Sequence, residues 1–140
     1  MTKKYKILGN YIKDLSSETP DVETYLIVRE RIGRYQLNID ISSKPLKNKM
    51  IEVNTSFKFE DKEPSKKKSH FEIIYSTIVK VSDEVKDKKE LEKIILCDVQ
   101  LEIYSDLEKA LLDLLHNSGY PRVKFEKKVD FEGLYNQRFN

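Results

Sequence analysis

Apolar and polar residues alternate along three stretches of the chain, at residues 35–41, 51–59 and 71–81. A period of two is typical of a strand that buries one face and leaves the other in water. Residues 42–49, with Pro45 among them, end the first stretch, and a polar stretch fills residues 60–69. The pattern therefore predicts a strand over each stretch, with the last two strands antiparallel and joined by a charged hairpin loop.

A weaker alternation over residues 5–15 predicts a further strand at the start of the chain. Gly9 and Asn10 interrupt this alternation, and because glycine readily accommodates a bulge or bend, we expect an irregular point there. Between residues 23 and 34 no period is clear, since a short apolar run is followed directly by charged residues and then by a glycine. We expect a crossing segment here.

The second half of the chain has a helical pattern over residues 88–115. Its apolar residues recur at spacings of three and four, which is the pattern of a helix with one continuous apolar stripe. They are Leu91, Ile94, Ile95, Tyr104, Leu107, Leu111, Leu114 and Leu115. Ser105 followed by Glu108 fits a capping box, so we expect a kink or break near Ile103. Gly119 and Pro121 end the stretch.

After the long helix, Val123 and Phe125 are compatible with a short edge segment, and Asp130 is placed to cap a final helix that carries Phe131 and Leu134. Strands that come first and helices that follow indicate an α+β fold. The expected fold is a four-stranded antiparallel sheet packed against a long, broken helix and a short C-terminal helix, all in a single domain over residues 1–140.

Charge and composition leave the partner open. The 140 residues include 26 Lys and Arg and 24 Asp and Glu, and a net charge of +2 creates no overall field that favours nucleic acid or an anionic membrane. Lys62 and residues 66–68 form a basic cluster in the predicted hairpin loop. A nucleic-acid site is one interpretation, but no aromatic residues are interleaved with these lysines, and a solvated hairpin tip that resists aggregation is favoured. We expect no nucleic-acid partner.

The single cysteine and the lack of long apolar stretches indicate the cellular location. Cys97 has no second thiol for an internal disulfide, and within an apolar helical stretch it is expected to be a small buried residue, in keeping with a reducing compartment. No apolar stretch of signal-peptide length follows the basic start, and no run of about 18 apolar residues occurs. We therefore expect a cytoplasmic protein without membrane insertion.

The usual groups of catalysis and metal binding are sparse. His70 and His116 have no ligand partner at i+4, and the carboxylates are scattered over positions with a surface pattern. No glycine-rich loop between a strand and a helix signals a phosphate site. We expect a protein that is not an enzyme and that has no cofactor and no metal, so its function must come from its surfaces.

Short motifs near the two ends of the chain carry a resemblance to a known family. They are YIKDLS at residues 11–16 with Pro20 behind it, GYP at 119–121 and VDFEGLY at 129–135. In their order and separation, with strands and one long helix between them, they resemble the SecB family of export chaperones, and the resemblance covers residues 5–135. It implies a chaperone that holds unfolded or slow-folding polypeptides competent for protein export.

The resemblance also implies an assembly and a client-binding groove. SecB subunits form a homotetramer, a dimer of dimers, in which the first strand and the long helix make the subunit contacts. Clients bind apolar grooves between helix and sheet, formed by the crossing segment and the strand after it. The matching residues here are Tyr25, Leu26, Val28, Tyr35, Leu37 and Ile39. Ordinary core packing is the alternative interpretation, and it is as well supported for Leu37 and Ile39.

In the same family, acidic residues on the first strand and the following turn engage the export motor SecA. These positions match Asp14 and Glu18, for which ordinary turn chemistry beside Ser16 and Pro20 is the alternative. Divergent SecB-like proteins also serve as chaperones dedicated to the antitoxin of a toxin-antitoxin system. That role is the alternative function, in which one aggregation-prone partner replaces a broad range of clients.

Overall fold

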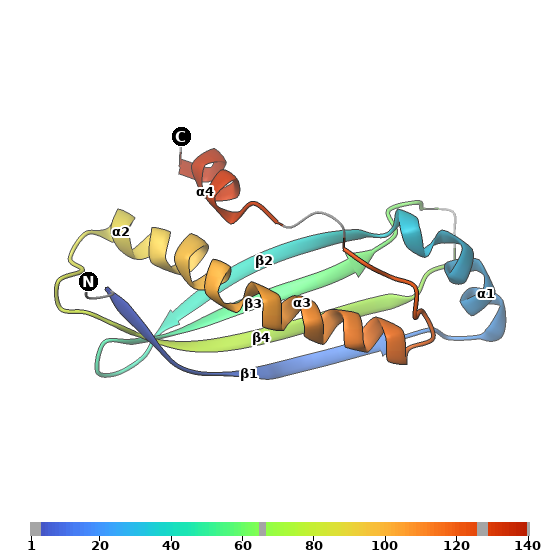
Figure 1. Ribbon diagram of the computed structural model, residues 1–140, viewed down its shortest axis with the longest axis horizontal. Coiled ribbons are helices and arrows are strands. Elements are labelled where there is room, and N and C mark those ends of the chain that lie inside the picture. The colour runs from blue at the N-terminus through green and yellow to red at the C-terminus, as the bar shows by residue number, and fades with distance from the viewer. Residues whose placement is uncertain (1–3, 65–66, 126–128, 140) are drawn as a thin grey trace.

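The computed structural model describes residues 4–64, 67–125 and 129–139 (Figure 1). The strands are β1 (Tyr5–Glu18), β2 (Gln36–Pro45), β3 (Met50–Glu60) and β4 (His70–Val81). The helices are α1 (Val22–Arg31), α2 (Lys88–Lys93), α3 (Val99–Asn117) and α4 (Phe131–Phe139), with a 3-10 helix at Ile32–Arg34 and a π-helical segment at Ile94–Asp98.

The four strands form one antiparallel sheet in the order β1-β4-β3-β2. Alternate residues of the two central strands are buried, as the period of two predicts, and they include Val53, Phe57, Phe71 and Ile73. The predicted α+β fold is confirmed, with the sheet, a long interrupted helix and a short C-terminal helix. The other face of the sheet carries the polar residues of each alternation.

Strand β1 lies at one edge of the sheet and β2 at the other, so the segment between them crosses from edge to edge. The register of β1 against β4 shifts between Ile7 and Gly9 and again between Ile12 and Asp14. The first shift confirms the irregular point predicted at Gly9. The strand runs on to Glu18, beyond residue 15, where the predicted strand ends.

Helix α3 lies along one face of the sheet, and α2 and α4 lie toward the same end of it (Figure 1). The apolar stripe of α3 buries Ile103, Leu107, Leu111 and Leu115 in a core shared with β3 and β4. Each such side chain contributes about 1.5–3 kcal/mol by leaving water. The predicted helix cap is confirmed at Asp130, whose Oδ1 accepts a hydrogen bond from the Gly133 amide at 2.9 Å.

The break in the long helix lies at Ile94–Asp98 and not near Ile103, where a capping box predicted it. Helix α3 continues through Ser105, because the buried stripe on either side holds that turn against the sheet. The π-helical segment is supported by Gln100, which is fully buried. Its Nε2 donates to the Ile95 carbonyl at 3.1 Å, and its Oε1 accepts from the Thr55 hydroxyl at 2.9 Å.

The crossing segment contains α1, which the sequence pattern did not reveal. Asp21 caps the helix by accepting a hydrogen bond from the Thr24 amide at 2.7 Å. Only Thr24 and Val28 of the helix are buried. An amphipathic stripe is therefore absent, although the chain is helical. Residues 118–125 form no strand, so the short edge segment expected at Val123 and Phe125 is not formed.

Candidate functional site

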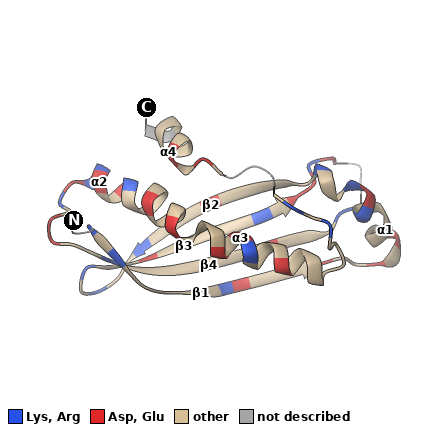
Figure 2. Ribbon diagram, viewed as in Figure 1, with Lys and Arg blue, Asp and Glu red and all other residues tan. Residues whose placement is uncertain are grey.

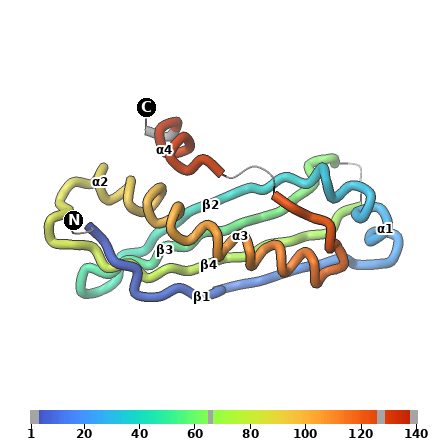
Figure 3. The backbone as a smooth tube through the Cα atoms, in the orientation of Figure 1, coloured from blue at the N-terminus to red at the C-terminus, as the bar shows by residue number. Residues whose placement is uncertain are grey.

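The crossing helix meets the segment that follows α3. The rings of Tyr25 and Tyr120 lie with centroids 5.4 Å apart, and the Tyr25 hydroxyl donates to the Gly119 carbonyl at 2.9 Å. Gly119 has a φ of +107°, and a Cβ atom there would lie 2.7 Å from Tyr25 Cε1. Only glycine fits this close approach without strain. Figure 3 shows the chain after α3 turning back beside α1.

Between these two segments lies a cleft of about 500 Å³. Its apolar wall and its charged rim come from α1, the 3-10 turn, the GYP motif and the two residues after that motif. The lining residues are Tyr25, Arg29, Glu30, Ile32, Gly119, Tyr120, Pro121, Arg122 and Val123. We call this the α1 cleft. It brings together two of the sequence motifs, the apolar run of the crossing segment and the GYP turn, which lie at opposite ends of the chain.

The far wall of the α1 cleft is held by hydrogen bonds. The Tyr120 hydroxyl lies 3.2 Å from the Ser69 hydroxyl and 3.3 Å from that of Thr19. His116 Nε2 lies 3.0 Å from the Val123 carbonyl oxygen. Since Tyr120 is only 2% exposed, its ring is fixed from behind. The cleft is therefore formed before any ligand arrives, which reduces the ordering cost of binding.

Two of the predicted client-binding residues lie in the core. Val28 is 0% exposed and Tyr35 is 6% exposed. The Tyr35 ring packs against Phe59 and Phe71, and its hydroxyl accepts a hydrogen bond from the Ser69 amide at 3.1 Å. Burial raises the pKa of the Tyr35 hydroxyl. Both side chains support the surface from beneath in this structure, so their contact with a client stays a prediction.

The remaining predicted residues divide between two places. Tyr25 lines the α1 cleft, and Leu26 is 52% exposed on the same helix. Leu37 and Ile39 are half-buried on β2, and Ile39 lines a smaller hollow of about 220 Å³ against α4. The other apolar residues of that hollow are Ile41, Leu96, Phe131, Leu134 and Tyr135. The two hollows share no lining residue, so the six predicted residues do not form one continuous site.

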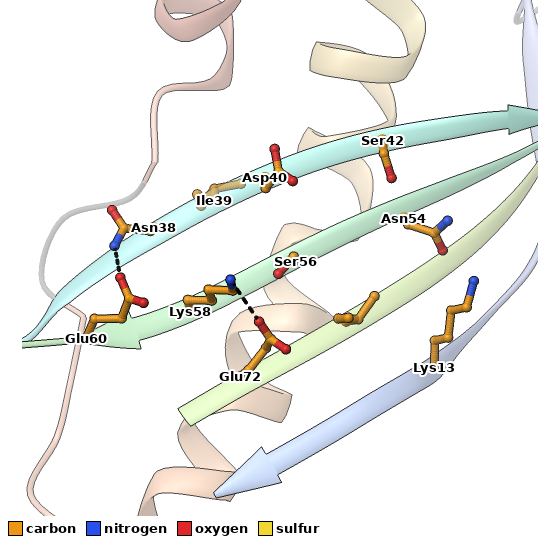
Figure 4. A pocket seen from close by; sticks show the side chains of 11 residues that line it. Lys13, Asn38, Ile39, Asp40, Ser42, Asn54, Ser56, Lys58, Glu60 and Glu72 are labelled. Carbon is orange, nitrogen blue, oxygen red and sulfur yellow. Dashed lines mark hydrogen bonds and ion pairs between the residues drawn. The ribbon is translucent and has the colours of Figure 1, made fainter. Parts of the chain in front are cut away.

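The outer face of the sheet carries a polar hollow of about 610 Å³ (Figure 4). Its charges are largely paired across the strands: Asn38 donates to Glu60 at 2.6 Å, and Lys58 lies 3.5 Å from Glu72. The sequence alternation did not signal this hollow, because polar residues on one face of a strand indicate only a solvated surface. Twisting of the sheet makes that surface concave.

The predicted motor-binding residues both lie on β1. Asp14 pairs in register with Ile74, and Glu18 pairs with His70. Because Ile74 lines the polar hollow and alternate residues of a strand share a face, both acids lie on the outer side of the sheet. Both are exposed. The geometry makes them accessible along the edge strand, and their role in binding a motor stays a prediction.

Strand β1 also exposes apolar side chains along the edge of the sheet. Leu8, Ile12 and Leu15 are each 47% exposed, and Tyr11 is 48% exposed. Leu101 on α3 is 56% exposed. An edge strand with exposed apolar side chains is an open template for pairing with another strand. The resemblance implied subunit contacts through these same two elements, β1 and α3.

An ion pair fixes the end of α1 to the end of β3. Arg31 Nε donates to Asp61 Oδ2 at 2.7 Å, and Arg31 Nη2 donates to Asp61 Oδ1 at 3.1 Å. These hydrogen bonds lower the pKa of Asp61 to about 2. Asp61 is 6% exposed. The pair therefore holds α1, and with it one wall of the α1 cleft, in a fixed position.

The basic cluster of the hairpin loop is partly engaged in ion pairs. Lys67 Nζ lies 3.0 Å from Glu23 and 3.9 Å from Asp21, both at the start of α1. Lys66 lies outside the described residues. Within the described part of the chain, no set of three or more His, Cys, Asp or Glu side chains is arranged to hold a metal ion. Across the same residues, no helix is long and apolar enough to span a membrane.

Comparison with known proteins gives a consistent result. The family model described as preprotein translocase subunit SecB matches residues 1–140. The chain is 61% identical to a putative protein-export protein SecB of Pelagibacter ubique over all 140 residues of both. It is 25% identical to the protein-export protein SecB of Parvibaculum lavamentivorans over 133 residues, which cover 95% of this chain and 77% of that protein.

A solved structure shares the fold. It is the SecB-like chaperone of Mycobacterium tuberculosis in complex with a ChAD peptide from the HigA1 antitoxin. The TM-score is 0.64 at 10% sequence identity, with 89% of this chain and 91% of that chain covered. The full-length family match and the 61% identity, together with the sheet and helix arrangement described above, show that this chain belongs to the SecB family of protein-export chaperones.

Proposed function

We propose that the protein binds unfolded or slow-folding polypeptides in the cytoplasm and keeps them competent for export. The observation that carries this proposal is the match to SecB over the entire chain. Members of this family are chaperones rather than enzymes, so the protein acts by binding. The apolar walls of the α1 cleft and the exposed side chains of β1 supply surface suited to that task.

Client contact in this proposal falls to Tyr25 and Leu26 at α1 and to Leu37 and Ile39 at β2. Val28 and Tyr35 are buried, so they reach a client only if α1 opens locally. Apolar burial contributes about 25 cal/mol per Å², whatever the client sequence. Several weak segments of one client combine through their effective concentration when the sites are repeated around an oligomer.

The proposed assembly is a homotetramer, built as a dimer of dimers. Strand β1 leaves one of its edges unpaired within the described part of the chain, and its neighbouring apolar side chains are about half exposed. Pairing with a second copy would cover that edge and those side chains together. SecA is the proposed motor partner, with Asp14 and Glu18 as its contacts on the outer face of the same strand.

A SecB-like chaperone dedicated to an antitoxin is the alternative function. The likeness to the mycobacterial complex favours it only through the shared fold. Client breadth distinguishes the two roles: an export chaperone binds many unfolded proteins, whereas a dedicated one binds a single partner. A toxin-antitoxin pair encoded next to the gene would also favour the dedicated role.

The proposal is tested by native mass measurement and by refolding. Mixed with a reduced, unfolded model client, the protein is expected to form a tetramer that gains one client, and an excess of subunits is expected to retard the client's refolding. A chain that leaves both the mass and the refolding rate unchanged contradicts general chaperone activity. Binding to one antitoxin alone would then establish the alternative.

A further inference from the structure

Charged residues form the rim of the α1 cleft, around its apolar walls. Arg29 from α1 and Arg122 from the segment after α3 line it, together with a single acid, Glu30. Both arginines are exposed, and neither forms an ion pair with a carboxylate among the described residues. Figure 2 shows basic residues on α1 and along the segment that follows α3. The rim therefore offers unpaired guanidinium groups beside aromatic rings.

The other acids near this rim are already engaged. Asp61 is paired with Arg31, and Glu23 lies 3.0 Å from Lys67. Asp21 accepts the capping hydrogen bond of α1. Arg34 and Lys124, which lie next to the cleft in sequence, are exposed and add further positive charge. These three acids thus have partners within the protein, and the cleft lining itself holds one acid, Glu30, against two arginines, which leaves the rim with a net positive charge.

We propose that the α1 cleft selects client segments in which an aromatic or aliphatic side chain is flanked by aspartate or glutamate. The inference rests on the proposed client-binding function and assigns the chemistry of its segment. The apolar side chain would pack between Tyr25, Ile32 and Tyr120. The flanking carboxylate would accept hydrogen bonds from Arg29 or Arg122, since guanidinium groups bind carboxylates in a planar, two-pronged geometry.

The selectivity is expected to be moderate and sensitive to salt. Exposed charge pairs are individually weak. Two of them are expected to make binding of an acid-flanked segment roughly threefold to tenfold tighter than binding of an uncharged one. The same positive rim would repel a segment flanked by lysine. Screening shortens the range of these interactions to about 8 Å at physiological ionic strength and to about 3 Å at 1 M salt, so the preference is expected to fade in high salt.

The test uses the full chain and three fluorescent peptides with one apolar core, flanked by glutamate, glutamine or lysine. Fluorescence anisotropy is expected to rank their affinities glutamate, glutamine, lysine at about 50 mM salt, with the order compressed at about 1 M. In the double variant Arg29→Gln, Arg122→Gln the three peptides are expected to bind alike. The double variant Lys44→Gln, Lys47→Gln removes the same charge from exposed residues outside the cleft lining and is expected to keep the ranking.

Each other result overturns the inference in a recognisable way. Equal binding of the three peptides by the unmodified protein, with client refolding still retarded, contradicts acidic selection and leaves the chaperone function intact. Loss of both peptide binding and refolding retardation removes the proposed function and the inference together. If a single-stranded oligonucleotide displaces the glutamate peptide and its binding depends on Arg29 and Arg122, the rim serves nucleic acid instead.

Discussion

The Tyr25 hydroxyl donates a hydrogen bond to the carbonyl of Gly119, which lies 94 positions further along the chain. This contact joins the crossing helix to the GYP turn and forms the base of the α1 cleft. It depends on a residue without a side chain, because Gly119 has a φ of +107° and Tyr25 Cε1 occupies the space that a Cβ atom would need. A local requirement on the backbone thus determines the shape of the cleft.

The first prediction concerns that glycine. Gly119→Ala is expected to lower the free energy of unfolding by about 1–3 kcal/mol, because alanine adopts a positive φ only with strain, and to weaken peptide binding by displacing Tyr25. Urea titration measures the stability change. Gly33→Ala is the matched control, since a Cβ atom at Gly33 meets nothing within 4 Å. Equal stability for the two variants would contradict the role assigned to Gly119.

The second prediction concerns the ion pair at the end of α1. The pKa of Asp61 is lowered from 3.8 to about 2 in the folded protein, so its stabilising effect is complete above pH 4 and is lost as the pH falls toward 2. Asp61→Asn is expected to cost about 1–2 kcal/mol at neutral pH, allowing for solvent screening, and progressively less toward pH 2.

Thermal unfolding of the Asp61 variant and of the unmodified protein over this pH range measures the difference. Glu23→Gln is the control, because it removes a carboxylate from an exposed pair with Lys67, in which water screens the interaction. A stability difference for Asp61→Asn that is the same at pH 7 and pH 2 would show that the charge of Asp61 is not what stabilises the contact.

The third prediction concerns the support of the π-helical segment. Gln100→Leu leaves the Thr55 hydroxyl and the Ile95 carbonyl buried without their hydrogen-bond partner. The expected loss is about 1–3 kcal/mol for each unsatisfied group. Denaturant titration is expected to show partial recovery when Thr55→Val is added, because one of the two orphaned groups is then removed. A double variant no more stable than Gln100→Leu alone would contradict this account.

The fourth prediction concerns self-association through β1. Ile12→Lys with Leu15→Lys places two charges on side chains that are 47% exposed, and lysine on an edge strand opposes pairing with another strand. Sedimentation velocity is expected to show smaller species than the unmodified protein forms, with unchanged circular dichroism. The control is Ser42→Lys, which adds a charge to β2 at the opposite edge of the sheet. This variant is expected to leave the assembly intact.

The sheet could be predicted because each central strand places its apolar residues at every second position. Phe57 and Ile73 are buried as this alternation predicts, and their polar neighbours lie on the outer face of the sheet. Helix α1 could not be predicted in the same way. Since only Thr24 and Val28 are buried, its helical state depends on the Asp21 cap and on contacts with distant residues such as Gly119. The spacing of apolar residues along the chain does not reveal such contacts.

The position of the helix break shows a similar limit. A capping box at Ser105 is a local pattern, whereas the π-helical segment depends on Gln100, whose hydroxyl partner Thr55 lies on β3. For the candidate site, the GYP motif and Tyr25 line the same cleft in the structure, and their contact with a client stays a prediction. Val28 and Tyr35 lie beneath the surface. Their burial could not be predicted, because the sequence alone does not reveal which apolar residues face inward.

The α1 cleft takes one wall from the first quarter of the chain and the other from the GYP turn near its end. During synthesis, the ribosome releases α1 and the sheet well before Gly119 and Tyr120 emerge. A partly made chain therefore has apolar helix surface but no finished cleft, and its own unfolded segments have no completed site to occupy. The α1 cleft is thus completed only after the GYP turn has been made and has packed against Tyr25, so the sheet can fold before the site that we propose for clients is formed.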